Sequence, residues 1–322
     1  MVVLLATLAL AAPLEVRTEA IMSTRITVAV PPEHIGEADA VFAVFRQVES
    51  TANEWRPGSP LSDVNAAAGG APVGVPAELI GLLKRGIALG DLTGGAFDIT
   101  WGALWGLWDF SGESTGVPPM EERRRRAARV DYRRVSIDEE AGAVGLDAGM
   151  VIGLGGLAKG HALDRAAALL DARGVGTYSL SAGGQVLVRG LRDGRAWRVG
   201  IRDPRGQESD YFGVVEVVDR SVSTSGDYER FFIVDGVRYH HILDPRTGSP
   251  PARGLRSATV IAADATTADA LSTALMVMGG DRGLALVESL PEVEAVVVDA
   301  RGEVSLSSGA RVAFVRDQIP LR

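Results

Sequence analysis

The chain has 322 residues, a formal net charge of −8 and 46% apolar residues, which is enough for a sizeable core. Its acidic charge argues against a general nucleic-acid binder, and with no cysteine it has no disulfides, thiolate metal sites, cysteine nucleophile or lipobox cysteine. It has only four histidines, so we do not expect a histidine-rich zinc site.

The N-terminal segment MVVLLATLALAAP resembles the apolar part of a secretory signal, although no Lys or Arg precedes it. It is too short to span a bilayer as a helix, and a buried N-terminal strand or helix is the alternative. We expect residues 1–20 to be a signal-peptide remnant or a disordered N-terminus. We expect residues 21–322 to form a single domain. We expect the protein to lie in the periplasm or another extracytoplasmic location, with peripheral membrane association as a further option.

The first half of the chain alternates helices with polar loops. Residues 25–30 (RITVAV) predict a strand, and a loop rich in Pro, Gly, Ser and Asn follows at residues 54–70. Residues 37–52 and 76–92 each carry an apolar face at helical spacing, and so do the tryptophans of residues 94–110. Those tryptophans are expected to pack in the core. The basic run at residues 123–126 is expected to be a solvated helix face.

The second half is mostly β. One more helix is predicted after the glycine-rich segment GMVIGLGGLAKGHALD, and strand-like segments then follow one another in hairpin-like succession. This order favours an α+β fold, with a mostly antiparallel sheet and packed helices, over a doubly wound one.

Two glycine-rich turns are candidate ligand sites. The first contains Gly153 and Gly156 at a strand-to-helix junction, where backbone N–H groups can approach a phosphate, although tight helix packing explains such turns equally often. Lys159 adds a cation there. The second, Gly183 in SLSAGGQV, marks a bulge or a close ligand approach. The serines of STSG at residues 223–226 are conceivable nucleophiles, but no His–Asp pair supports that role.

Asp269 and Thr273 lie four residues apart on an otherwise apolar helix, so both oxygens project from one face. Hard oxygen donors of this kind suit Mg²⁺. For the pair alone, N-terminal capping is the commoner explanation.

Two further residues carry alternatives of the same kind. His241 precedes LDPRTG and could act as a general base, although a histidine at a strand end is more often structural. Asp98 in GGAFDIT could hold a ligand hydroxyl or cap the tryptophan-rich helix.

Taken in order, these segments resemble the ApbE family of FAD:protein FMN transferases from about Ile21 onward. The blocks are MST at Met22, EWRPGSPLSDVNAAAG, GGAFDIT, LGGLAKGHALD, SVSTSGDYER, HHILDPRTGSP and ADALSTALMVMG. The resemblance implies an ApbE-like, T-fold-related domain. It also implies Mg²⁺-dependent transfer of FMN from FAD to a Thr or Ser hydroxyl of an acceptor protein, with release of AMP.

The resemblance also implies roles for individual residues. Asp269 and Thr273 match the family's side-chain metal ligands, and Gly156 falls where a backbone carbonyl completes the site. His241 matches the candidate base for the acceptor hydroxyl. The positions that match FAD contacts are Met22, Trp55, Ala96, Phe97, Asp98, Lys159 and Leu243.

Four positions depart from the family pattern. The usual Asp before LGG is Gly153, the Asn or Asp before AGG is Ser181, the acidic residue after GG is Gln185, and the Gly of MGT is Ser23. These changes motivate two alternatives: a protein that binds FAD without transferring FMN, and a Mg²⁺-dependent FAD pyrophosphatase in which water replaces the acceptor hydroxyl.

Overall fold

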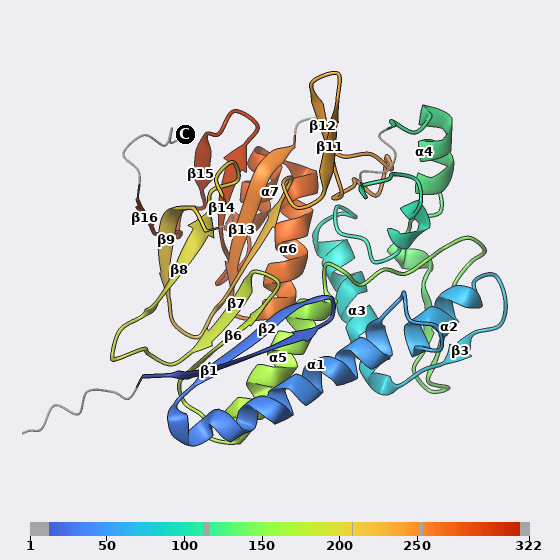
Figure 1. The fold of residues 1–322 in the computed structure, drawn as a ribbon. Helices are drawn as coiled ribbons and strands as arrows, with labels where there is room; N and C mark the ends of the chain where they lie inside the picture. The colour runs from blue at the N-terminus through green and yellow to red at the C-terminus, as the bar shows by residue number, and fades with distance from the viewer. Residues whose placement is uncertain (1–12, 112–115, 208, 252–253, 316–322) are drawn as a thin grey trace, which may run out of the picture.

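The computed structural model describes residues 13–111, 116–207, 209–251 and 254–315. Its centre is an eight-stranded sheet in the order β1-β2-β6-β7-β10-β13-β14-β15, and each pair of neighbouring strands is antiparallel. Helices cover one face and a three-stranded sheet covers part of the other (Figure 1). The predicted α+β class with a mostly antiparallel sheet is confirmed.

The strands are β1 (Glu15–Ile21), β2 (Thr24–Val30), β3 (Val73–Gly74), β4 (Ser136–Asp138), β5 (Ala143–Gly145), β6 (Tyr178–Ala182), β7 (Gln185–Arg189), β8 (Trp197–Arg202), β9 (Tyr211–Val217), β10 (Ser221–Gly226), β11 (Phe231–Val234), β12 (Val237–His240), β13 (Leu255–Ala262), β14 (Glu294–Asp299), β15 (Val304–Leu306) and β16 (Val312–Phe314). The α-helices are α1 (Ala38–Ala52), α2 (Pro60–Ala66), α3 (Ala77–Leu92), α4 (Met120–Ala127), α5 (Ala158–Ala172), α6 (Ala265–Met278) and α7 (Gly280–Glu288). Short 3₁₀ turns cover Pro32–Glu37, Gly102–Leu104 and Tyr132–Arg134.

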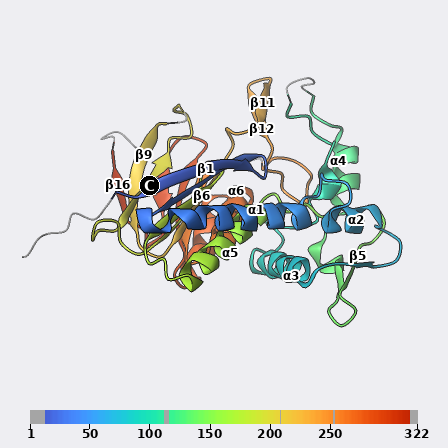
Figure 2. The ribbon, with the colours of Figure 1, turned by 60° about the horizontal axis from the view of Figure 1, so that its bottom comes forward.

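Helices α1, α5 and α6 pack side by side on one face of the large sheet, as Figures 1 and 2 show. The expected face of α1 is buried, with Val41, Phe45 and Val48 at most 1% exposed. Close packing of α5 on α6 depends on Gly160, because a Cβ there would lie 2.5 Å from the carbonyl oxygen of Ala265. Only glycine allows the two helices to approach this closely.

A second core lies between the large sheet and the sheet β16-β9-β8. Trp197 and Ile201 of β8 pack with Val222 of β10 and Val296 of β14. The large sheet is therefore buried on both faces in this region, which fits the nearly continuous apolar sequence of β14.

Two expectations about the N-terminus and the tryptophan segment need correction. Residues 15–20, which we assigned to the leader, form most of β1 and pair with β2, so the folded region includes them. Residues 1–12, which hold nearly all of the apolar signal-like stretch, lie outside the described residues. The tryptophan segment is not a helix. It makes one 3₁₀ turn at Gly102–Leu104 and then a left-handed Gly106 with φ 72°.

None of the helices in the described ranges combines the length and apolar character needed to cross a bilayer.

Candidate active site

Asp269 does not cap α6. The first-turn N–H groups are satisfied elsewhere: Asp264 accepts from the Thr267 N–H at 2.8 Å, and Asp164 of α5 accepts from Ala265 and Thr266 at 2.6 and 2.8 Å. Asp269 lies in the second turn and points toward α5. The capping explanation therefore fails for Asp269, and its carboxylate needs another role.

The Asp269 carboxylate is nearly inaccessible, with the residue 6% exposed. Its contacts are the Gly160 N–H at 3.4 Å and the Lys159 ammonium at 3.8 Å. Burial raises the pKa of Asp269, and Lys159 and the Gly160 N–H oppose part of that rise. A buried carboxylate with two long contacts has lone pairs left for a cation.

Thr273 lies one turn further along the same face, beside hydroxyls from β10. Its Oγ1 is 3.3 Å from the Ser225 Oγ, which also shares a 2.8 Å hydrogen bond with Ser272. The STSG serines thus face α6 and pair with its hydroxyls, and this arrangement gives no support to a nucleophilic serine.

The backbone of Gly156 lies close to the Thr273 side chain because residue 156 has no Cβ. A Cβ on Gly156 would lie 3.3 Å from both the Thr273 Oγ1 and the Phe97 Cε2, so even a methyl group would crowd this gap. Asp269 and Thr273 share one face of α6, and Gly156 lies against Thr273. Their carboxylate, hydroxyl and backbone oxygens are hard donors, and this chemistry fits Mg²⁺. Among the described residues no cluster of three or more His, Asp or Glu side chains offers a competing metal site.

Lys159 connects the metal-ligand candidates to the rest of the site. Its Nζ donates to the Gly155 carbonyl oxygen at 2.7 Å. Its Cδ lies 3.5 Å from where a Gly183 Cβ would be, and Thr24 Oγ1 lies 3.1 Å from the same point. Because Gly183 has no side chain, Lys159 and Thr24, the first residue of β2, can both pack against the second glycine-rich turn.

The β1–β2 turn carries Met22 and Ser23, whose φ angles are 54° and 55°. The Met22 N–H donates to the Glu49 carboxylate at 2.9 Å, and a hollow of about 510 Å³ lies beside the turn. Left-handed backbone costs a non-glycine residue about 1 kcal/mol, so Ser23 occupies a position where glycine would be unstrained.

The aromatic residues form a platform next to the glycine-rich turn. The rings of Trp55 and Trp105 are 4.1 Å apart, and Trp101 meets Trp105 edge-on at 5.8 Å. Trp55 is 67% exposed, which leaves one indole face free for a flat ligand. Phe97 is buried against Gly156, and Ala96 is buried beside it.

Asp98 has a structural task in this conformation. Its carboxylate accepts from the Thr100 N–H and Oγ1 at 2.7 and 2.6 Å, and from the Tyr132 N–H at 3.1 Å. Burial raises the pKa of Asp98, and these bonds offset part of the rise. It holds the loop that carries Phe97, and its contact with FAD stays a prediction.

His241 presents a neutral, unpartnered imidazole nitrogen. Its backbone N–H donates to the Arg230 carbonyl at 3.0 Å, while its buried Nδ1 has no hydrogen-bond partner in the described residues. Burial and, to a smaller extent, the charges of Arg230 and Lys159 lower the pKa of His241 to about 4. Lys159 thus acts electrostatically on both His241 and Asp269. Leu243, two residues after His241, packs on the cluster around Leu104 and Trp108.

The departures at residues 153, 181 and 185 have different surroundings. A Cβ on Gly153 would lie 2.8 Å from Trp105 and 2.9 Å from the Trp101 Nε1, so no side chain fits there. Ser181 is a half-buried residue of β6 and pairs with β2 and β7. Gln185 donates to the Ala265 carbonyl at 2.7 Å and so binds the start of α6.

Sequence reasoning missed two polar residues of this site, Glu54 and Ser272, and considered Ser225 only as a nucleophile. The serines belong to blocks that we quoted, but only the strand–helix packing reveals their contacts. Glu54 lies in the connection from α1 to α2, and the charge of Lys159 reaches it from α5. The spacing of Glu54 and Lys159 along the chain gives no sign of this proximity.

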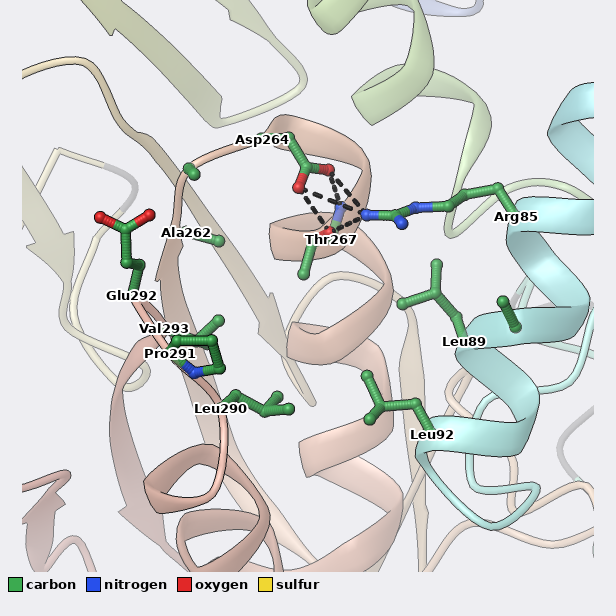
Figure 3. A pocket seen from close by; sticks show the side chains of 12 residues that line it. Arg85, Leu89, Leu92, Ala262, Asp264, Thr267, Leu290, Pro291, Glu292 and Val293 are labelled. Carbon is green, nitrogen blue, oxygen red and sulfur yellow. Dashed lines mark hydrogen bonds and ion pairs between the residues drawn. The ribbon is translucent and has the colours of Figure 1, made fainter.

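A separate cavity of about 360 Å³ lies between α3, the start of α6 and residues 290–293 (Figure 3). Arg85 reaches across it to Asp264 and Thr267. Residues two apart on a helix project about 200° from each other, so Thr267 and Asp269 face opposite sides of α6. This cavity is distinct from the site around Asp269.

Comparison with known proteins gives one consistent result. The ApbE family model matches residues 22–297. The FAD:protein FMN transferase of Treponema pallidum is 38% identical over 288 residues, which cover 84% of this chain and 79% of that protein. The FAD:protein FMN transferase of Vibrio cholerae is 35% identical over 249 residues, which cover 76% and 74% of the two chains.

Solved structures agree with the sequence comparison. The crystal structure of the ApbE protein of Thermotoga maritima matches with a TM-score of 0.84 and 36% identity, over 92% of this chain and 97% of that chain. The flavin transferase ApbE of Vibrio cholerae matches with a TM-score of 0.78 and 28% identity, over 94% and 97% of the two chains.

Proposed function

The chain belongs to the ApbE family, and we propose on this basis that it is an FAD:protein FMN transferase that uses Mg²⁺ and a Thr or Ser acceptor hydroxyl. The observation that carries the proposal is the set of candidate oxygen donors of Asp269, Thr273 and Gly156. Lys159 forms an ion pair with Asp269, and its charge also lowers the pKa of His241.

The reaction exchanges one phosphorus–oxygen bond for another. The acceptor oxygen forms a bond to the FMN phosphorus, the bond from that phosphorus to the AMP oxygen breaks, and AMP leaves. The acceptor hydroxyl loses its proton in this exchange. The site must therefore bind the pyrophosphate, hold the flavin and accept a proton.

The residues divide these tasks according to their chemistry. Asp269, Thr273 and the Gly156 carbonyl would hold Mg²⁺, which supplies Lewis-acid stabilisation of the pyrophosphate charge. The Lys159 ammonium adds a second positive charge next to the phosphates. The exposed face of Trp55 and the apolar surface of Phe97 suit the flavin ring.

His241 would accept the proton of the acceptor hydroxyl. Its lowered pKa keeps the imidazole neutral at pH 7, and its buried Nδ1 has no hydrogen-bond partner in the described residues. Binding of a negatively charged pyrophosphate nearby raises the pKa of a histidine and so strengthens it as a base in the complex.

Gly153 motivates a second candidate function, because it removes an expected carboxylate. In that case the protein binds FAD, and either retains it unchanged or hydrolyses it with water. Incubation with FAD, Mg²⁺ and an acceptor separates these cases. A transferase adds FMN to the acceptor and releases AMP in equal amounts, a pyrophosphatase yields AMP and free FMN without an acceptor, and a storage protein yields neither.

We also propose that this protein works in the periplasm or another extracytoplasmic location, on a secreted or membrane-anchored acceptor. The apolar, signal-like N-terminal stretch supports this location. Expression of the full chain, followed by fractionation with periplasmic and cytoplasmic marker proteins, tests it.

A further inference from the structure

Glu54 is a half-buried acid that the roles described so far do not use. It lies between the end of α1 and Ser59, the N-cap of α2. Burial raises the pKa of its carboxyl, and the backbone N–H of Leu154 and the charge of Lys159 oppose part of that rise. No hydrogen bond or ion pair joins its carboxylate to another side chain in the described part of the chain.

Glu54 lies near the part of the glycine-rich turn where Gly153 has no side chain. Trp55, the next residue, stacks on Trp105, and Trp105 lies against Gly153, so the α1–α2 connection reaches this turn. The N–H of Leu154, the residue after Gly153, lowers the pKa of the Glu54 carboxyl. A side chain at Gly153 is sterically blocked, because Trp101 and Trp105 occupy the space where its Cβ would lie. Trp101 fixes this arrangement by donating from its Nε1 to the Gly153 carbonyl at 2.9 Å. The negative charge near this turn therefore comes from the α1–α2 connection.

The neighbours of Glu54 define what it can bind. An ionised carboxylate accepts hydrogen bonds and repels phosphate, so its partner must be a donor group. Trp55 follows it in the chain and offers the free indole face, and the charge of Lys159, at the start of α5, acts on its carboxyl. A ligand that meets all three groups needs a flat ring for the indole, a hydrogen-bond donor for the carboxylate and a negative charge for the ammonium, and FAD carries all of these.

We propose that Glu54 accepts a hydrogen bond from a sugar-type hydroxyl of FAD next to the pyrophosphate, and so supplies the acidic contact that Gly153 cannot make. This inference rests on the proposed function. It makes Glu54 a substrate-binding residue, and it explains how the glycine-rich turn tolerates glycine at residue 153. Both a ribityl hydroxyl on the FMN side and a ribose hydroxyl on the AMP side have this chemistry.

Binding of FAD to the Glu54→Gln, Glu54→Ala and Glu54→Asp variants tests the proposal by quenching of flavin fluorescence, without any turnover. We expect the FAD Kd to rise at least tenfold for the Gln and Ala variants, and less for Asp, which keeps the charge. The matched control is Glu139→Gln, an acid in an exposed ion pair with Lys84, which should leave the Kd unchanged. Thermal unfolding should show the Gln variant to be at least as stable as the wild type, because it removes a partly buried charge.

Competition with FMN and with ADP distinguishes the two hydroxyl sources. If the contact is a ribityl hydroxyl, Glu54→Gln weakens FMN binding and leaves ADP binding unchanged, and the reverse holds for a ribose hydroxyl. An FAD Kd within twofold of wild type for a folded Glu54→Gln protein would overturn this inference and leave the proposed function standing. A wild-type protein that binds no FAD would overturn the proposed function as well.

Discussion

The ammonium of Lys159 lies 3.8 Å from Oδ2 of Asp269, and this is the only ion pair of that buried carboxylate within the described residues. A single, long ion pair is weak compensation for a carboxylate that is 6% exposed. The arrangement fits a site in which Asp269 meets a cation and Lys159 turns to the phosphates.

Asp269→Ala should lower FMN transfer at least 100-fold and weaken the dependence on Mg²⁺. Stability in the absence of Mg²⁺ should stay equal or rise, because the substitution removes an under-compensated buried charge. The measurements are AMP release over a Mg²⁺ titration and urea unfolding.

Asp264→Ala is the matched control on the same helix. Asp264 is the N-cap of α6, so its loss should cost about 1 kcal/mol of stability and leave turnover largely intact. If the two variants exchanged these phenotypes, the assignment of Asp269 as a ligand would be wrong.

Gly156→Ala should reduce Mg²⁺ affinity and turnover with little loss of stability. The added methyl would lie 3.3 Å from the Thr273 Oγ1 and so crowd a candidate ligand. Gly81→Ala on α3 serves as control, because its Cβ meets no atom within 4 Å and alanine favours a helix by about 1 kcal/mol. Unchanged Mg²⁺ affinity in Gly156→Ala would count against the carbonyl of Gly156 as a ligand.

His241→Gln should abolish transfer while FAD still binds with nearly wild-type affinity. The pH dependence of kcat/KM and of kcat in the wild type should also reflect the ionisation of His241. Since the pKa of His241 is lowered to about 4 in the free protein, its neutral form persists well below pH 6.5, and the acid limb of kcat/KM should lie there. Because bound pyrophosphate raises this pKa, the acid limb of kcat should lie at higher pH. Coincident limbs near pH 6.5 would contradict the base assignment.

His240 should make stability depend on pH. Burial lowers the pKa of His240 to about 4, whereas its unfolded value is near 6.5, so the unfolded chain binds the extra proton between these values. This contribution is complete above pH 6.5 and is lost as pH falls toward 4, by up to about 3 kcal/mol. His240→Phe keeps a ring but cannot titrate, so its unfolding free energy should change less over this range. Parallel curves for the two proteins would refute the prediction.

The helices with a clear apolar period could be predicted from the sequence. Residues 37–52 and 76–92 predicted α1 and α3 within one residue at each end, because one face of each helix is buried. The tryptophan segment was mispredicted because its spacing imitates a helix, whereas Gly106 turns the chain with a positive φ. Strand β1 was missed because most of it is exposed, so it carries no strong apolar alternation.

For the site, the sequence could predict pairs on one element but not contacts between elements. Asp269 and Thr273 share a helical face, so their alignment follows from their spacing. The proximity of Glu54 to Leu154 and Lys159 depends on how the α1–α2 connection packs on the start of α5, about 100 residues later in the chain. The filling of the Gly153 gap by two indoles is likewise a tertiary effect.

The most direct test of the central claim is covalent flavin transfer. The wild-type protein and Asp269→Ala are incubated with FAD and an acceptor that carries a Thr or Ser flavinylation motif, with Mg²⁺ or with EDTA, beside a known flavin transferase as positive control. Flavin fluorescence of the acceptor is then read in a denaturing gel. We predict a fluorescent acceptor band only for the wild type with Mg²⁺. A dark acceptor band with a working positive control, or an equally bright band for Asp269→Ala, would contradict the account.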